Sequence, residues 1–406
     1  MRIYRSQSRL TFRRQRRRSG CASVLFLLSV IASTALITWA WLEGRSGLRE
    51  ASAPPGDRMA AAQAAFDRGD LNTAIALARE LLVEQPHFPP AVRLLARALV
   101  YRSYSDYDRA VDRDSAVEVT TEAVQYQPSN DELVASHAFA LAAARRPGAS
   151  ADAARRVLEA KPDHAFARTA LALAYGTAGS YELALREAMQ AVNAARGAET
   201  FDAVRALAIA YGDLGNYVEA ARTAERAIAL NPRILTLYFE RALFALQLGD
   251  ADSATVAYYQ VLVYDPDNVK ARLRLCELSS LLRERDAAIS YCQEVIRRAP
   301  AYAEGWFRLG REYFLQGEFV VAQQHLNRCA TLQTMQNVPV AERRFECWYL
   351  QGQAAQILGD CDALVATYNE FRAMALSDPR LEQTWTYPPE GPPGCSPLSP
   401  AAEPGS

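Results

Sequence analysis

Apolar and small residues recur with helical spacing along most of this chain, most regularly between Trp306 and Ala330. Trp306, Leu309, Gly310 and Tyr313 are spaced i, i+3, i+4 and i+7, which places them on one face of a helix. Gly317 interrupts this pattern. The same spacing then resumes in a second segment through Ala322, Leu326, Cys329 and Ala330. The pattern predicts two helices joined by a glycine turn.

Two sequence markers show that this helical hairpin is repeated. The small residue near the start of each second helix recurs at Ala74, Ala116, Ser150, Ala184, Ala220, Ala254, Ala288 and Ala322. The intervals are 42, 34, 34, 36, 34, 34 and 34 residues. A proline that closes the hairpin recurs at Pro86, Pro128, Pro162, Pro232, Pro266 and Pro300. Both markers give the same period and the same irregularity near residue 110, so the chain is predicted to be a repeat array.

Small residues also recur on the first helices, at Ala172, Ala208, Ala242, Cys276, Gly310 and Gly352. We expect the second helix of the same hairpin to approach closely there, because a larger side chain would overpack the contact at a cost of about 1–3 kcal/mol. Glycines at 69, 179, 215, 249, 317 and 359 mark the turns. The third hairpin lacks this glycine, and Pro147-Gly148 is the predicted substitute.

The pattern resembles the tetratricopeptide repeat, a two-helix unit of 34 residues that carries W-x2-L-G-x2-Y followed by Ala and Pro. The resemblance implies an all-α, right-handed α-solenoid of about nine hairpins over residues 57–378. Extra residues are expected within Ser103 to Asp114 and within Thr331 to Arg343. The ninth hairpin, which has Leu364 in place of alanine, is expected to be a capping pair.

In this family the first helices line a concave groove that holds a peptide or a partner's helix. The resemblance therefore implies a protein or peptide partner. The positions that would face the groove are Thr169, Leu173, Arg205, Ile209, Phe239, Leu243, Leu273, Glu277, Phe307 and Arg311. The alternative interpretation is that Phe239 and Phe307 only pack between neighbouring first helices. The lysines and asparagines of the family's carboxylate clamp are missing at these positions.

The amino-terminal segment predicts a membrane anchor. Residues 1–20 contain eight arginines and no acidic residue, and residues 21–42 form an uncharged apolar run. As a helix this run would be about 33 Å long, enough to cross a hydrocarbon core of about 30 Å. The arginines predict a cytoplasmic amino terminus, which would put the repeats outside the cytoplasm. A signal peptide cleaved near Ala51-Ser52-Ala53, giving a secreted or periplasmic protein, and a buried core helix are the alternatives.

Residues 43–56 are a predicted linker, and residues 379–406 are a Pro-rich segment that its composition predicts to be disordered. The formal net charge of −1 conceals an uneven distribution. Without the eight amino-terminal arginines, 37 basic residues stand against 46 acidic ones. An acidic body argues against nucleic-acid binding, which requires a basic face.

Six cysteines follow the predicted anchor. In an antiparallel hairpin that turns near Arg283-Glu284, Cys276 and Cys292 would face each other. Cys329 ends the eighth hairpin and Cys347 opens the ninth, while Cys361 and Cys395 could tie the tail back. These three pairs are candidate disulfides in an oxidising compartment. The alternative is that Cys276 and Cys329 are small apolar residues in close-packed contacts.

No catalytic, cofactor or metal motif is recognisable in the sequence. The four histidines lie in four different repeats, and the acidic residues from Asp106 to Asp114 do not match a calcium loop because Val111 and Val117 occupy its key positions. We therefore expect a protein that is not an enzyme and binds no cofactor, metal or small-molecule substrate. The expected function is a membrane-anchored, extracytoplasmic scaffold in envelope assembly, secretion or cytochrome maturation. The alternative is a self-associating structural or spacer protein of the cell envelope.

Overall fold

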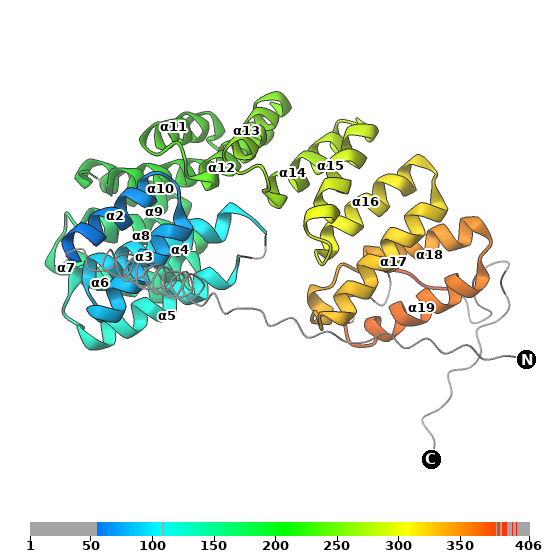
Figure 1. Ribbon diagram of the computed structural model, residues 1–406, viewed down its shortest axis with the longest axis horizontal. Helices are drawn as coiled ribbons and strands as arrows, with labels where there is room; N and C mark the ends of the chain where they lie inside the picture. Colours follow the sequence, from blue (N-terminus) through cyan, green and yellow to red (C-terminus); the bar gives the residue numbers. More distant parts are fainter. Residues whose placement is uncertain are drawn as a thin grey trace, which may run out of the picture. The chain divides into compact units, whose positions relative to one another are not determined.

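The computed structural model describes residues 55–107, 109–197, 199–378, 380–381, 384–387, 392 and 395. These residues form eighteen α-helices and one short 3-10 helix, with no strand among them. The helices make nine consecutive hairpins, which stack in chain order (Figure 1). The all-helical repeat array predicted from the sequence is confirmed for this part of the chain.

The first helices of the nine hairpins are α2 (Pro55–Asp67), α4 (Pro89–Ser105), α6 (Asp131–Ala143), α8 (Ala165–Thr177), α10 (Glu199–Asp213), α12 (Leu235–Gln247), α14 (Val269–Leu281), α16 (Ala303–Gln316) and α18 (Glu346–Leu358). The second helices are α3 (Leu71–Glu84), α5 (Val111–Tyr126), α7 (Pro147–Ala160), α9 (Tyr181–Ala194), α11 (Tyr217–Leu230), α13 (Ala251–Tyr264), α15 (Arg285–Arg298), α17 (Phe319–Met335) and α19 (Cys361–Ala375). The 3-10 helix η2 (Val340–Glu342) lies between α17 and α18.

A residue with left-handed backbone follows every first helix except α4 among the described residues. Gly317 closes α16 with a φ of 87°, a conformation that costs least for glycine because it has no Cβ. Arg145 and Arg283 occupy the same place in the third and seventh hairpins, with φ values of 58° and 63°. The predicted Pro147-Gly148 turn is therefore corrected. Arg145 makes the turn, and Pro147 begins α7, where its fixed φ suits the first helical position.

The two late glycines on first helices accommodate different neighbours. A Cβ on Gly310 would lie 2.8 Å from Cγ of Leu326 on α17, so this glycine permits the predicted approach of the second helix. A Cβ on Gly352 would instead lie 2.2 Å from Cη2 of Trp385, which follows α19. The close partner at Gly352 is thus a segment of the carboxy-terminal tail.

Helix α4 is enclosed on all sides. Eleven of its residues are buried, whereas a helix with one exposed face would bury about half as many. Its Arg97 forms an ion pair with Asp202 of α10, with 2.8 Å between Nη2 and Oδ2, and both side chains are almost inaccessible. The Tyr101 hydroxyl donates to the same carboxylate at 2.7 Å. The second hairpin therefore packs against the fifth, about a hundred residues away in the chain.

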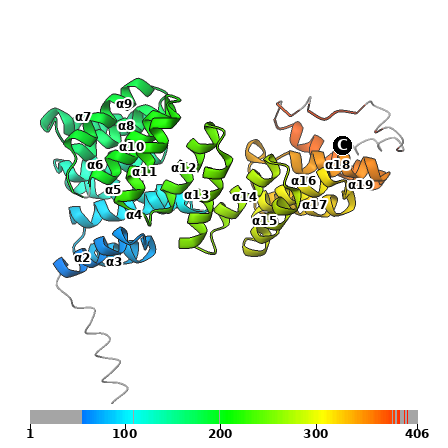
Figure 2. The same ribbon diagram turned by 90° about the horizontal axis from the view of Figure 1, so that it is seen from above.

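The carboxyl end of α4 extends this contact to the sixth and seventh hairpins. The Thr236 hydroxyl of α12 donates to the Tyr101 carbonyl at 3.0 Å, and the two helices lie side by side (Figure 2). Asn268 caps α14, and its side-chain amide donates to the Ser105 carbonyl at 2.9 Å. The extra residues predicted in the second hairpin lengthen α4 to 17 residues, and Ser105 in this extension makes the contact with Asn268.

Part of the Pro-rich tail is folded against the last hairpin. The ring of Trp385 is almost fully buried and meets Tyr368 and Phe371 of α19 at centroid distances of 5.1 and 5.2 Å. The Tyr387 hydroxyl donates to Gln356 of α18 at 3.0 Å. The predicted disorder of residues 379–406 is corrected for these described residues, because their aromatic rings bury apolar area that the Pro-rich composition does not reveal.

Residues 1–20, 21–42 and nearly all of 43–56 lie outside the described residues, and so does most of the segment after residue 387. The predicted anchor at 21–42 therefore stays a prediction. Within the described part of the chain, none of the helices combines the length and the apolarity needed to cross a membrane.

The buried ion pair between α4 and α10 gives a stability prediction. Asp202→Asn removes the anion that Arg97 faces and leaves a buried cation without its partner, which costs about 3–5 kcal/mol. The matched control is Asp152→Asn, since Asp152 pairs with Arg155 on the surface of α7 and such pairs contribute about 0–1 kcal/mol. The free energies of unfolding come from urea denaturation. Equal effects of the two substitutions would contradict a structural role for the buried pair.

A second prediction concerns the docked tail. Gly352→Ala places a methyl group inside the ring of Trp385, so the indole must leave its pocket and its fluorescence emission must shift to longer wavelength. The same substitution in a Trp385→Phe background should leave the emission unchanged. Gly148→Ala is the control for the glycine change itself, because its Cβ would meet nothing within 4 Å. An unshifted spectrum for Gly352→Ala would show that Trp385 does not occupy this pocket.

Candidate binding surface

The first helices share one side of the array, which we call the first-helix face. A pocket of about 410 Å³ opens on this face between α12 and α14. Phe239, Leu243 and Leu246 of α12 line one wall, and Lys270 and Leu278 of α14 line the other. Apolar walls with a few charged groups are typical of surfaces that hold a peptide side chain.

The end of α4 and Arg205 border this pocket on its amino-terminal side. Arg205 of α10 is 6% exposed, and its guanidinium binds Glu240 of α12 at 2.6 Å. The same guanidinium lies over the rings of Tyr101 and Tyr104 at 5.1 and 5.7 Å. Tyr104 and Arg205 line both this pocket and a second one of about 460 Å³ beside α8 and α10. The end of α4 therefore separates the face into two parts.

Lys270 is the cation at the bottom of the pocket. Its ammonium donates to the Tyr104 carbonyl and lies 4.2 Å from the ring centroid of Phe239. Burial lowers the pKa of Lys270 to about 8, because the charged form loses hydration there. Its backbone N–H donates to Asp106 at 2.9 Å, and burial raises the pKa of that carboxyl. The pocket thus contains a cation whose pKa is lowered to about 8.

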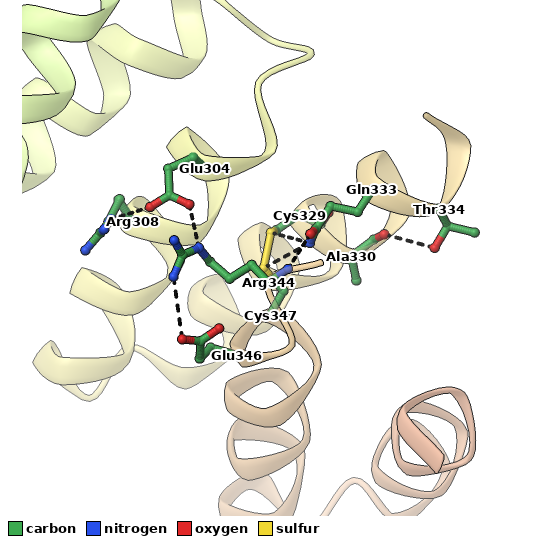
Figure 3. The surroundings of a disulfide bond; sticks show 9 residues. All are labelled: Glu304, Arg308, Cys329, Ala330, Gln333, Thr334, Arg344, Glu346 and Cys347. Carbon is green, nitrogen blue, oxygen red and sulfur yellow. Dashed lines mark hydrogen bonds and ion pairs between the residues drawn. A yellow bond between two sulfur atoms is a disulfide. The ribbon is translucent and has the colours of Figure 1, made fainter. Parts of the chain in front are cut away.

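A ladder of ion pairs continues along the first-helix face beyond the pocket. Arg308 of α16 bridges Glu277 of α14 at 2.9 Å and Glu304 of its own helix at 2.7 Å. Arg344 binds the other oxygen of Glu304, and lies 3.5 Å from Glu346 of α18 (Figure 3). Ion pairs therefore connect α14 to α16, and α16 to α18 through Arg344.

A disulfide lies next to Arg344, the last arginine of this ladder. Cys329 of α17 is bonded to Cys347 of α18, and Gln333 lies beside both sulfur atoms (Figure 3). The side-chain oxygen Oε1 of Gln333 accepts from the backbone N–H of Arg344 at 2.6 Å. The guanidinium of Arg344 lies 4.7 Å from the ring centroid of Phe307. The inserted segment before α18 thus brings an arginine onto the first-helix face.

The structure separates the ten predicted groove residues into several groups. Arg205, Phe239, Leu243 and Glu277 surround the 410 Å³ pocket, and Leu173, Arg205 and Ile209 line the second pocket. Three more are buried in contacts between helices, namely Thr169, Leu273 and Phe307. Arg311 lies at the surface, 3.8 Å from Glu312. Their role in binding stays a prediction.

Sequence reasoning missed Tyr104, Lys270 and Arg344. Tyr104 and Lys270 are more than 160 residues apart in the chain, so no local motif connects them. Arg344 lies in the insertion between two repeats, where the repeat alignment predicts no position. The scarcity of lysine, with only Lys161 and Lys270 in the chain, was the one signal available for Lys270.

The six cysteines after the predicted anchor are joined in the three pairs that the sequence suggested. Cys276–Cys292, Cys329–Cys347 and Cys361–Cys395 have Cα–Cα distances of 5.4, 6.0 and 5.4 Å. These distances fall within the range of disulfides. No group of three or more His, Cys, Asp or Glu side chains in the described residues is arranged to hold a metal ion.

The lowered pKa of Lys270 predicts how stability depends on pH. Between about pH 8 and pH 10.5, the unfolded chain keeps the proton that the folded chain has released, so the free energy of unfolding rises with pH. The slope from this one group approaches about 1.4 kcal/mol per pH unit. The measurement compares wild type with Lys270→Met in urea denaturation from pH 7 to 10.5. A difference between the two proteins that stays constant across this range would contradict the shift.

A family model for the tetratricopeptide repeat matches residues 205–271. No curated protein matches the sequence. A tetratricopeptide repeat protein from Parabacteroides merdae is 16% identical, with coverage of 64% of this chain and 98% of that one and a TM-score of 0.40. YrrB, described as such a protein with an unusual peptide-binding site, is 18% identical, with coverage of 47% and 97% and a TM-score of 0.35. A human IFIT1 dimer with PPP-AAAA is 16% identical, with coverage of 71% and 73% and a TM-score of 0.47.

The matched segment starts within α10 and ends at the start of α14, so it covers most of the fifth hairpin and all of the sixth. Similar two-helix hairpins precede and follow it, and most of them keep the 34-residue period. Residues 205–271 therefore match the tetratricopeptide-repeat family, and two-helix hairpins lie on both sides of them.

Proposed function

We propose that the protein is a non-catalytic scaffold that binds a protein or peptide segment on the first-helix face between α12 and α18. The observation that carries the proposal is the pocket at Phe239, because it lies next to exposed aliphatic side chains. Leu243 is 52% exposed and Leu281 is 74% exposed, and both belong to the pocket lining. Exposed leucines beside an apolar pocket are typical of an interaction surface.

The chemistry of the face indicates how a segment would bind. An aliphatic or aromatic side chain would enter the pocket between Phe239 and Leu278, and the rest of the segment would lie over the ion-pair ladder. The ladder charges are already paired, so they need no ligand charge to be satisfied. Affinity would then come mainly from the apolar anchor, as in most binding hot spots.

The division of the face at Tyr104 supports a binding site on the later hairpins. Helix α4 is joined to α10 and α12 by hydrogen bonds, so it separates these hairpins from the second pocket. The amino-terminal hairpins would then act as a rigid support. A rigid surface loses less conformational entropy when it binds a ligand.

We further propose that residues 21–42 anchor this scaffold in a membrane, with the repeats outside the cytoplasm. The apolar run and the preceding arginines support this topology. The three disulfides between residues 276 and 395 also support it, since disulfides persist in oxidising compartments. Envelope assembly, secretion and cytochrome maturation are processes that use such a scaffold, and a secreted or periplasmic form would follow from signal cleavage.

The alternative function, self-association as a structural spacer, has less support. Hairpin arrays associate end to end when the apolar face of a terminal hairpin is open. In this chain, Trp385 and Tyr387 cover α18 and α19 at the carboxyl end. The covered end favours a scaffold with a different protein as its partner.

Site-specific photocrosslinking in the native cell tests the proposed binding surface. A photoreactive amino acid at Leu281 should capture a discrete protein partner, and Leu243→Arg in the same chain should reduce that product at least about tenfold by blocking the pocket. Val83 of α3 is 83% exposed and provides the control position away from the face. If the products from Leu281 and Val83 are identical, or if Leu243→Arg leaves the Leu281 product unchanged, the first-helix face is not the binding surface.

A further inference from the structure

The charges that line the pocket between α12 and α14 do not balance. Among the described residues, the lining contains three cations and two carboxylates, namely Arg205, Lys270, Arg274, Glu240 and Glu277. Arg205 binds Glu240 at 2.6 Å. Arg274 binds Glu277 at the same distance. Lys270 is therefore the one cation of this described lining that has no carboxylate within ion-pair distance.

The ammonium of Lys270 also has hydrogen-bonding capacity left over. An ammonium carries three N–H donors. One of them donates to the Tyr104 carbonyl, and the ring centroid of Phe239 lies 4.2 Å from Nζ. Within the described part of the chain, Nζ makes no second hydrogen bond. The remaining donors are available to a group that enters the pocket.

The charged groups packed around Lys270 oppose one another. Glu240 of α12 and Asp106 after α4 favour the charged ammonium, whereas Arg274 of α14 and Arg113 of α5 disfavour it. The carboxylate of Asp106 accepts from the backbone N–H of Lys270 at 2.9 Å. Burial has the largest effect on the ammonium. The free protein has thus already removed much of its hydration, and a ligand carboxylate would gain attraction without causing that loss again.

The pocket lining changes from polar to apolar along both helices. Thr236 and Lys270 lie near the amino-terminal ends of α12 and α14. Leu246 and Leu281 lie at their carboxyl ends. Leu278, beside the proposed anchor, follows Lys270 by eight residues, which is about 12 Å along the helix. An extended segment covers this distance with about four residues, so it can place an apolar side chain at one end and a charged one at the other.

A single carboxylate suits the polar end better than a phosphate does. A phosphate group carries nearly two negative charges, and clusters of arginine commonly supply the several donors that it requires. The arginines of this pocket are already bound to Glu240 and Glu277. One ammonium without an ion pair matches one carboxylate. An aspartate or glutamate side chain provides that group on a short aliphatic stem, which can pack against the apolar wall.

We propose that Lys270 selects a partner segment that carries an aspartate or glutamate side chain within about four residues of its apolar anchor, and that it binds this carboxylate inside the pocket. This selectivity depends on the function proposed above, because it concerns the same pocket. The ion pair adds discrimination between partners to the affinity that the apolar anchor provides.

Selection from a phage-displayed library of random decapeptides, with the full-length protein as bait, tests the proposal. The peptides are fused through their carboxyl ends, so any acidic group in them belongs to a side chain. Enriched peptides that fail to bind Leu243→Arg should contain Asp or Glu near an aliphatic or aromatic residue. In fluorescence anisotropy, replacing this acid by its amide should weaken binding to wild type at least about tenfold.

Lys270→Met should weaken binding of the acidic peptide by a similar factor and should bind the acidic peptide and its amide counterpart equally, because both changes remove the same contact. Lys161→Met is the matched control at the only other lysine of the chain, whose ammonium pairs with Asp131 at the surface. This control should bind both peptides as wild type does. Circular dichroism of each variant establishes that the fold is retained.

The pH dependence of wild type gives a second measurement, which needs no substitution in the protein. With its pKa at about 8, Lys270 is mostly charged at pH 7 and mostly neutral at pH 9. Carboxylates and guanidinium groups ordinarily titrate outside this range. The affinity for the acidic peptide should therefore fall about tenfold between pH 7 and pH 9, whereas the affinity for the amide counterpart should stay constant.

The proposal is overturned if the enriched peptides that require the pocket contain no more acidic residues than the library does. It is also overturned if Lys270→Met keeps the preference for the acidic peptide, or if wild type binds that peptide equally at pH 7 and pH 9. The function proposed above would survive each of these results. A selection that yields no peptide sensitive to Leu243→Arg would contradict that function, and the selectivity of Lys270 with it.

Discussion

The ion pair between Arg97 and Asp202 determines how much of the first-helix face stays open. A charge pair buried this deeply is stable only when both partners stay in place, so it fixes α4 against α10. Tyr101 donates to the same carboxylate, and Thr236 then joins α12 to the Tyr101 backbone. The first six hairpins are consequently held together by contacts across the array in addition to those between neighbours.

The later hairpins are stabilised in a different way. They have no enclosed helix like α4, and their first helices are joined at the surface by the ladder of Glu277, Arg308, Glu304 and Arg344. All three disulfides belong to this part of the chain. Surface ion pairs contribute little stability individually, so the covalent links compensate for the missing long-range packing. This arrangement leaves a surface that is both rigid and accessible.

The two insertions in the repeat array both contribute residues to the first-helix face. The extension of the second hairpin carries Tyr104 and Asp106 to the amino terminus of α14, where they border the pocket at Lys270. The insertion before the ninth hairpin supplies Arg344 to the first-helix face. Departures from the 34-residue period thus mark the functional candidates more clearly than the repeats themselves do.

The sequence by itself determined the helical hairpins, because these depend on spacing within one or two neighbouring repeats. It also suggested the three cysteine pairs, which the structure joins. Gly310 could be assigned to a close helix contact for the same reason, whereas Gly352 accommodates Trp385 of the tail. Only the tertiary structure decided which groove positions are open. Arg205 and Phe307 have the spacing of exposed groove residues, yet both are buried under partners that come from distant or inserted segments. Periodicity specifies the face on which a residue lies, but the exposure of that face depends on contacts between segments that no local pattern relates.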